Sequence, residues 1–414
     1  MSKNRILAVV FLTIFIDMMG MGILIPTFPM LIAPHALHRI IPSTWTVAQG
    51  FILGGWLLAT FPIMQFFFSP LLGQLADRYG RRRVLALSLA GTSVSYVLFA
   101  IGIITHNIPL LFFSRMVDGA TGGNISVAQA VIGDVSSPEH RARNFGLVGV
   151  ALGLGFILGP FLGGVLSDPS LVPWFHITTP FYFAALLALI NVLLVLWLLP
   201  ETLQHVNPEP IQWKRPLANI AQVFRVPELR STIPAIFLFN SGFTFFTTFW
   251  GVVLAEDFGF SQGHIGNFFG FMGIMVVLSQ GGLVRRLSGK VQDYRVLRFS
   301  IFATGFCLVP YYFIPGDKPL WIYAIPPFLA IAMALTKSFS GALLTRITRP
   351  QIRGEVMGIN SSANALAQVL PAILAGYLAA EHARLPILVG SITVLAGGVV
   401  FWKGINRLLN NPIP

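Results

Sequence analysis

The sequence predicts an all-α membrane protein whose twelve transmembrane helices form two pseudo-symmetric six-helix bundles. Three observations support this fold class: the apolar composition, the number of long apolar segments, and the repetition of motifs between the two halves of the chain. Of the 414 residues, 55% are hydrophobic and only 10% are charged, whereas a soluble domain carries roughly a quarter charged residues. The chain has too few polar side chains to cover a soluble surface, so most of its surface is expected to face lipid.

Segments long enough to cross a bilayer recur along the whole chain. A transmembrane helix needs about 20 predominantly apolar residues. Twelve segments fit this requirement, and the ninth is the shortest: 6–32, 45–72, 84–105, 109–132, 145–166, 179–199, 233–255, 265–283, 299–314, 320–344, 356–380 and 385–402. The first follows Lys3 and Arg5 and has no small-residue cleavage site, so we expect a retained helix rather than a signal peptide.

The distribution of basic residues predicts the orientation of these helices. If both termini are cytoplasmic, most of the 27 lysines and arginines lie in cytoplasmic loops or at cytoplasmic helix ends. The exceptions are Arg39, Lys318 and Arg384 in loops on the other side, and Arg115 and Lys337 within helices. This asymmetry follows the positive-inside rule. It accounts for the net charge of +12, so no nucleic-acid partner is expected.

The chain is expected to divide into an N-terminal bundle at 1–200, a cytoplasmic linker at 201–230 and a C-terminal bundle at 231–414, because the linker is rich in proline and charge. A repeat supports this division. Two glycines seven positions apart, followed by a basic residue, begin at Gly73 and again at Gly282, roughly 210 positions later. Duplicated halves of this kind place a substrate path at their interface.

The loop at 73–83 reads Gly-Gln-Leu-Ala-Asp-Arg-Tyr-Gly-Arg-Arg-Arg and closely resembles the signature loop of the major facilitator superfamily. Arg115 and Gly119 in the fourth helix and Pro-Glu-Thr at 200–202 resemble further motifs of that family. The Gly-Pro-rich stretch at 155–164 looks like the antiporter motif of its twelve-helix drug:proton antiporter branch. The fold implied by this resemblance is the major facilitator fold.

Two more segments indicate which group within this family the N-terminal half resembles. Asp17 to Pro26 in the first helix and the Arg-Ala-Arg-Asn-Phe-Gly stretch at 141–146 make the N-terminal half look like the tetracycline exporters in particular. Those exporters carry further intramembrane acids in helices three and nine, whereas 84–105 and 299–314 contain none here. Tetracycline itself is therefore not the expected substrate.

The signature loop at 73–83 has two possible functions. It can be a basic loop that only sets the topology. The resemblance implies instead that it latches the two halves on the cytoplasmic side, with Asp77 facing a helix N-terminus of the other half and an arginine pairing with Asp134. A carboxylate near a helix N-terminus is electrostatically favourable. The latch residues are Gly73, Asp77, Arg78, Gly80, Arg81 and Asp134.

The predicted fifth helix carries a stripe of glycines, which have no side chains. Gly155, Gly159 and Gly163 are four residues apart, which lets a neighbouring helix approach closely, and Pro160 removes a backbone donor and permits a bend. Ordinary tight packing explains the stripe by itself. A role in antiport is implied only by the resemblance.

Charges in the middle of predicted spans are functional hypotheses by default, because each costs several kcal/mol unless it is paired or hydrated. Asp17 and Asp118 are the two acids well within helices. On a continuous fourth helix, Arg115, Asp118 and Gln129 share one face, and Gln129 is a candidate for substrate binding. Arg115 and Asp118 can form a purely structural ion pair. Alternatively, Asp17 carries a coupled proton, Arg115 controls its protonation, and Asp118 is a structural or substrate partner and the next candidate for the proton.

The second half contains no central carboxylate and offers amides and hydroxyls instead. The candidates that could line a substrate cavity are Asn240, Thr244 and Thr247 on the seventh helix, and Asn360, Asn364 and Gln368 on the eleventh. These side chains can equally form hydrogen bonds between helices, with no role in binding substrate. Lys337 on the tenth helix can snorkel to the interface or attract an anionic substrate.

These features favour one class of protein. The chain has no phosphate-cradling loop for an ATP-driven pump, no clustered histidines, and a single cysteine, Cys307, so no enzyme activity, cofactor or metal site is expected. The expected protein is a monomeric proton-coupled antiporter that exports a small organic molecule, with a role in multidrug resistance, in the lipid of a bacterial inner membrane. The alternative is proton-coupled or facilitated transport of a hydrophilic metabolite such as a sugar, an organic acid or a metal chelate.

Overall fold

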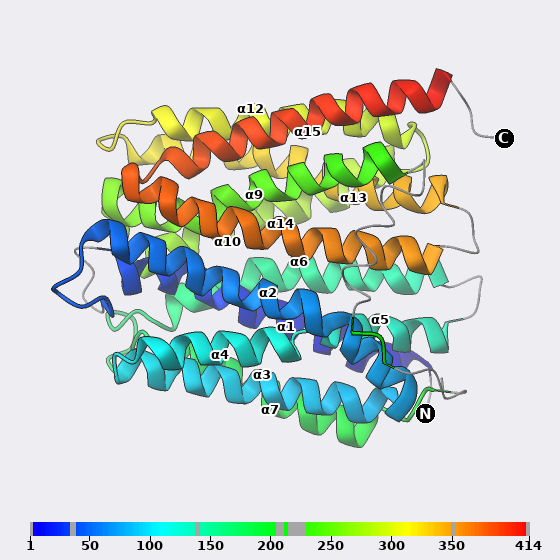
Figure 1. Cartoon of the computed structure of the whole chain (residues 1–414), viewed down its shortest axis with the longest axis horizontal. Helices are drawn as coiled ribbons and strands as arrows, with labels where there is room; N and C mark the ends of the chain where they lie inside the picture. Colours follow the sequence, from blue (N-terminus) through cyan, green and yellow to red (C-terminus); the bar gives the residue numbers. More distant parts are fainter. Residues whose placement is uncertain are drawn as a thin grey trace. The chain divides into compact units, whose positions relative to one another are not determined.

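The computed structural model describes residues 3–33, 39–136, 141–203, 211–213, 229–348 and 353–410. Every regular element within these residues is helical (Figure 1). The first helices are α1 (Lys3–Ile32), α2 (Val47–Tyr79), α3 (Arg81–Ile104), α4 (Ile108–Thr121), α5 (Asn124–Val135), α6 (Arg141–Val165) and α7 (Thr179–Leu198). The later ones are α9 (Leu229–Phe258), α10 (Gln262–Ser279), a π-helix (Gln280–Val284), α11 (Arg285–Leu287), α12 (Asp293–Phe313), a 3-10 helix (Pro319–Ala324), α13 (Pro326–Ile347), α14 (Arg353–Glu381) and α15 (Leu385–Asn410).

Eleven helices of the described part are long and apolar enough to cross a membrane. The predicted fourth span is the exception, because α4 and α5 are separate helices of 14 and 12 residues. The prediction of one continuous helix over 109–132 is therefore wrong, although the two short helices together cover that range. The short ninth segment extends to a 21-residue helix, α12.

The chain forms two compact units. The first consists of residues 1–44, 60–213 and 260–270, and the second of residues 45–59, 214–259 and 271–414. The beginning of α2 thus belongs with the second unit and the beginning of α10 with the first. Most of the predicted linker, at 204–210 and 214–228, lies outside the described residues.

In the first unit, α1 packs along α6, and α3 packs against α4 and α7 (Figure 1). The core contains large aliphatic side chains from α1, α3, α5 and α7, among them Val10, Leu85, Val131 and Val195. The chain begins α4 with Asn107, whose side chain accepts a hydrogen bond from the amide of Leu110 at 3.0 Å. This cap satisfies one of the free amides of the first helical turn.

The glycine stripe of α6 is the surface on which α1 lies. A Cβ atom at Gly155 would approach the Met18 Cβ to 2.6 Å, and one at Gly159 would approach the Gly22 Cα to 2.8 Å. Real Cβ atoms do not come this close, so the backbones of α1 and α6 can meet only because these positions carry no side chain. At Gly163 the neighbour is the ring of Pro26, at 2.9 Å.

Glycine pairs recur at two other helix crossings. In the first unit, Gly164 of α6 faces Gly266 of α10, and in the second unit Gly55 of α2 faces Gly376 of α14. In each case an added Cβ would lie about 3.0 Å from the Cα of the opposite glycine. The same device therefore packs pairs of helices in both units.

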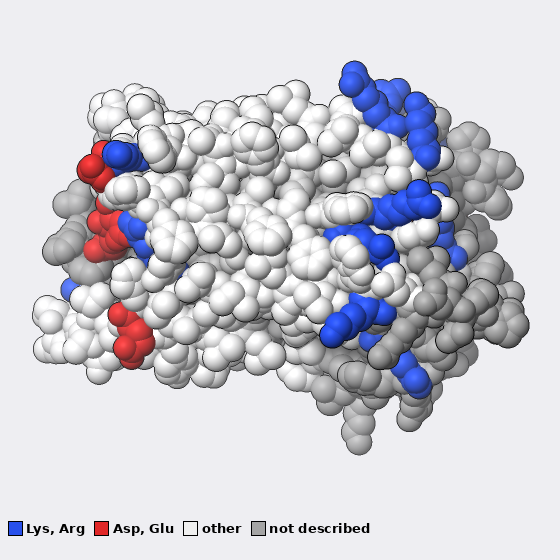
Figure 2. Space-filling view, turned by 90° about the horizontal axis from the view of Figure 1, so that it is seen from above, with Lys and Arg blue, Asp and Glu red and all other residues white. Residues whose placement is uncertain are grey.

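In the second unit, α12 lies beside α13 and α15, and α9 packs against α14 and α15 (Figure 1). Apart from Lys337 in α13, most described basic side chains of this unit lie at helix ends, among them those in α11, at the start of α12 and near the end of α15. Figure 2 shows Lys and Arg gathered in this way, with no charged side chain in the middle of the visible helices. A band without charges is what a lipid-facing surface requires.

We predict that Gly159→Leu destabilises the protein, because the new side chain must displace the backbone of α1. Overpacking of this kind costs typically about 1–3 kcal/mol. Thermal unfolding in detergent should therefore occur at a lower temperature than in the wild type. Gly149→Leu is the matched control on the same helix, since no atom of the described residues lies within 4 Å of a Cβ there. Equal loss of stability in both variants would contradict the packing role.

Candidate functional site

Three buried charged side chains lie close together in the first unit. Asp17 of α1 is 8% exposed, and Arg115 and Asp118 of α4 are 3% and 4% exposed. Asp118 is near enough to Asp17 for the two carboxylates to repel each other. Burial of three ionisable groups in one place is expensive unless partners compensate each of them.

Arg115 and Asp118 compensate each other. The Arg115 Nη1 atom lies 3.1 Å from the Asp118 Oδ2 atom, in an ion pair one helical turn apart. The guanidinium also lies over the ring of Phe99, at 4.6 Å from its centroid, and near that of Tyr96, at 5.9 Å. Its Nε and Nη2 atoms are buried without a hydrogen bond among the described residues. The aromatic faces therefore supply part of the stabilisation of this cation.

Asp17 has a different kind of partner. The side-chain amide of Asn124 donates a hydrogen bond to the Asp17 Oδ1 atom at 2.6 Å. Asn124 is fully buried, and its own Oδ1 atom has no hydrogen-bond partner among the described residues. Asp17 is thus held by a neutral donor, whereas Asp118 is held by a cation.

The interruption between α4 and α5 places Asn124 at this position. Gly122 and Gly123 have φ/ψ angles of −70°/11° and −82°/4°, which do not continue an α-helix. The carbonyl oxygen of Gly122, freed by the break, accepts a hydrogen bond from the Gln65 side chain at 2.9 Å. Asn124 is then the first residue of α5.

The break corrects one prediction from the sequence. Gln129 lies in α5, beyond the interruption, so it does not share a continuous helical face with Arg115 and Asp118. Sequence reasoning also missed Asn124 and Tyr96. The signal for Asn124 was present, because a polar residue follows two glycines in the middle of an apolar span. Tyr96 gave no such signal, and its ring lies against Gly20 of α1, one turn from Asp17.

The second unit joins the predicted amides of α9 and α14. The Asn240 side chain donates to the Asn364 Oδ1 atom at 2.8 Å, and the Gln368 side chain donates to the carbonyl oxygen of Asn364 at 3.3 Å. The Thr244 hydroxyl donates to the carbonyl oxygen of Asn240. One turn from Asn364, the Asn360 Oδ1 atom is buried without a hydrogen bond among the described residues.

Lys337 is near the middle of α13 and its side chain is exposed. Its ammonium group lies 5.3 Å from the centroid of the Phe243 ring on α9. Phe243 is one helical turn from Asn240, so the cation and the amide pair lie in the same region of the second unit. Contact with α9 at mid-helix differs from the snorkelling alternative, in which the side chain reaches a helix end.

The predicted latch residues form a polar network within the first unit. The Arg81 Nη1 atom lies 2.5 Å from Asp77, and its Nε atom lies 3.2 Å from Asp134. Glu201 accepts hydrogen bonds from the backbone amides of Arg81 at 2.8 Å and Arg82 at 3.3 Å. Glu201 thus caps the N-terminus of α3, where a carboxylate is favourable.

Two glycines of this loop differ in their roles. Gly80 has a φ of 99° immediately before α3, a conformation that glycine adopts at no steric cost. At Gly73 no described atom lies within 4 Å of a Cβ position, so local contacts do not require glycine there. Arg78 lies over the Tyr79 ring at 5.7 Å. The action of this network on the second unit stays a prediction.

A family model described as Major Facilitator Superfamily matches residues 10–370. The chain belongs to the major facilitator superfamily. The family and the major facilitator fold predicted from the sequence are thereby confirmed. The protein is a multi-pass membrane transporter, and, as for other members of this family, small molecules are its substrates.

Several members of the superfamily are similar to this chain in sequence or in structure. The major facilitator superfamily domain-containing protein 10 of Mus musculus is 26% identical, over 97% of this chain and 93% of its own length. The class C tetracycline resistance protein of Escherichia coli is 34% identical, over 68% of this chain and 66% of its own length. The solved structure of the human organic anion transporter MFSD10 has a TM-score of 0.73 at 23% identity, covering 97% of this chain and all of that one.

A double-variant cycle tests whether Arg115 and Asp118 act as a structural pair. Arg115→Met should destabilise the protein strongly, because Asp118 is left as an unpaired buried charge, typically a loss of about 3–5 kcal/mol. Arg115→Met combined with Asp118→Leu should recover most of this loss. The measurement is thermal unfolding without substrate. If the double variant is as unstable as Arg115→Met alone, the two residues are not coupled.

Proposed function

We propose that the protein is a proton-coupled antiporter that exports a small organic molecule by alternating access, and that Asp17 carries the coupled proton. The observation that supports this proposal is the unequal partnership of the two buried carboxylates. Burial penalises the charged form of each. Arg115 offsets this penalty for Asp118, whereas the partner of Asp17 is a neutral amide. Asp17 is therefore the better candidate for reversible protonation.

Arg115 is the proposed switch. It lies in the same buried cluster as Asp17 but pairs with Asp118 in this conformation. A shift of α1 relative to α4 would bring the guanidinium towards Asp17 and favour release of its proton. Asn124 is the proposed positioning residue, because its amide holds the ionised Asp17 carboxylate.

The names of the relatives support export without deciding the substrate. Several are tetracycline resistance proteins, which cover between about half and nine tenths of this chain. The N-terminal half resembles the drug:proton antiporter branch, and the latch and the glycine stripe are proposed to serve the conformational change. A bacterial inner membrane with both termini cytoplasmic is the proposed location, and a monomer the proposed state.

We predict that Asp17→Asn abolishes transport driven by a proton gradient. The variant mimics the protonated side chain, so it should still bind substrate, and binding should no longer depend on pH between about 5 and 9. The measurement is uptake of a mixed panel of drugs and metabolites into proteoliposomes, with and without an imposed pH gradient. Asn124→Leu should keep coupling but move the pH midpoint of transport upwards, because the ionised carboxylate loses its donor.

Asp317→Asn is the control, since this acid lies exposed in the turn after α12. It should leave coupling and pH dependence unchanged. Proton-driven accumulation of substrate by Asp17→Asn would overturn the assignment of the proton carrier. Asp118 would then be the next residue to test.

A hydrophilic anionic metabolite is the second candidate substrate. Lys337 and the amides of Asn240 and Asn360 lie in one region of the second unit, and a cation in a polar region suits a carboxylate or phosphate. A solved relative is named as an organic anion transporter, and another as a D-xylose-proton symporter. Organic acids are therefore the metabolites that this observation favours.

Lys337→Met separates the two candidates. If the substrate is anionic, this variant should lower its transport at least about tenfold, the equivalent of one strong charged contact, while transport of neutral compounds in the panel stays the same. Lys318→Met is the matched control outside the spans. Unchanged anion transport in Lys337→Met would contradict the role of Lys337 in binding the anion.

A further inference from the structure

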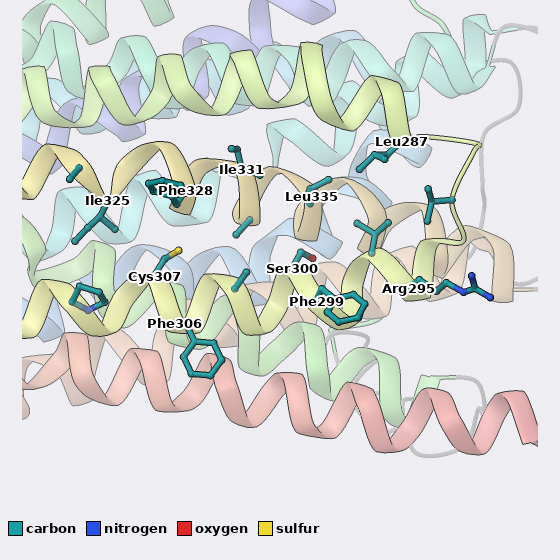
Figure 3. Close-up of a pocket in the computed structure, with 16 residues that line it drawn as sticks. Leu287, Arg295, Phe299, Ser300, Phe306, Cys307, Ile325, Phe328, Ile331 and Leu335 are labelled. Carbon is teal, nitrogen blue, oxygen red and sulfur yellow. The ribbon is translucent and has the colours of Figure 1, made fainter.

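An open groove of about 910 Å³ runs along the second unit between α12 and α13 (Figure 3). The rings of Phe299, Phe306 and Phe328 border it and are 69%, 63% and 67% exposed. Ser300 and Ala332 line it from below and are buried. Phenylalanines this exposed, in helices that cross a membrane, are in contact with lipid.

Small side chains create the groove. Ser300 and Ala303 of α12 face Ala332 of α13 along it, where larger residues would fill the space. The two helices are joined beneath it by a hydrogen bond of 2.8 Å from the Thr336 hydroxyl to the Ser300 hydroxyl. This buried bond fixes the spacing of the helices, so the groove is a built feature of the unit rather than a gap between loose elements.

The groove has one charged residue, at one end. Arg295 in the first turn of α12 lines it beside Leu287 and Val291, and the rest of the lining is almost entirely apolar (Figure 3). Its guanidinium forms no ion pair with any described residue. The neighbouring Arg298 is engaged elsewhere, because it lies over the Trp402 ring and donates to Asn406 at 2.5 Å.

We propose that this groove binds one acyl chain of an anionic phospholipid, with the phosphate of the headgroup at Arg295. From Arg295 to Pro310, the groove follows α12 for 15 residues, about 22 Å, whereas one leaflet contributes about 15 Å of hydrocarbon. A complete acyl chain can therefore lie in it while its headgroup stays at the basic end of the helices. A basic residue at that depth favours an anionic over a zwitterionic headgroup.

Photo-crosslinking of the full chain tests the proposal. The protein is placed in phosphatidylcholine nanodiscs with a small fraction of phosphatidylglycerol that carries a diazirine in the middle of one acyl chain, and adducts are mapped by mass spectrometry. Adducts should concentrate on 299–310 and 325–335. They should be about fivefold more frequent than with the matching photo-reactive phosphatidylcholine, as expected for one basic contact near a headgroup.

Two variants with matched controls isolate the two parts of the site. Arg295→Gln should remove the preference for phosphatidylglycerol, whereas Arg286→Gln, a basic residue at the same end that does not line the groove, should keep it. Ala303→Trp should fill the groove and reduce adducts of both lipids. Ile392→Trp, exposed on α15 outside the groove, should not.

Three results would overturn the proposal. The first is an even spread of adducts over the exposed faces of α3, α7 and α15. The second is a headgroup preference that persists in Arg295→Gln. The third is displacement of the adducts by small amounts of a lipophilic cation such as ethidium, which would assign the groove to a drug-like ligand instead of a lipid.

Discussion

The constraint on which this structure depends is the absence of water from the hydrocarbon core of a membrane. Every backbone N–H and C=O group at that depth must find its partner within the protein. The described spans are helical for this reason, and the break between α4 and α5 is compensated. Where α4 ends at Gly122–Gly123, the Gln65 side chain bonds the carbonyl oxygen that the break exposes. The break is thereby stable enough to serve as part of a site.

The same constraint explains the contrast between the two units. The first unit concentrates its buried charges around Arg115, whose guanidinium pairs with Asp118 and lies on aromatic rings. Asp17 stands apart because its partner is the neutral amide of Asn124. In the second unit, uncharged amides partner each other, and the Asn240 side chain is hydrogen-bonded to Asn364. The predicted proton site therefore lies in one unit, and the amides predicted to bind substrate lie in the other.

The lipid surroundings also determine how the helices pack against each other. Lipid tails are as apolar as leucine, so apolar side chains alone do not drive helices together, and close approach of backbones takes over this role. Glycines on α6 admit α1, and glycine pairs hold α2 to α14 and α6 to α10 within their units. The small residues of α12 and α13 that line the groove are not covered by any other helix lining it among the described residues. They leave an open groove in place of a helix contact.

The sequence by itself determined the fold family, the spans other than the fourth, and which residues carry charge at membrane depth, because hydropathy, residue spacing and family motifs are local properties of the chain. Asp17, Arg115, the α6 glycines and the amides of α9 and α14 were all identified in this way. Only the tertiary structure determined which of these side chains contact each other. Asn124 reaches Asp17 because a break within an apolar stretch reorients it, and the groove beside Arg295 exists because two separate helices place small residues opposite each other. Such pairings depend on distances between helices, which no pattern along a single chain encodes.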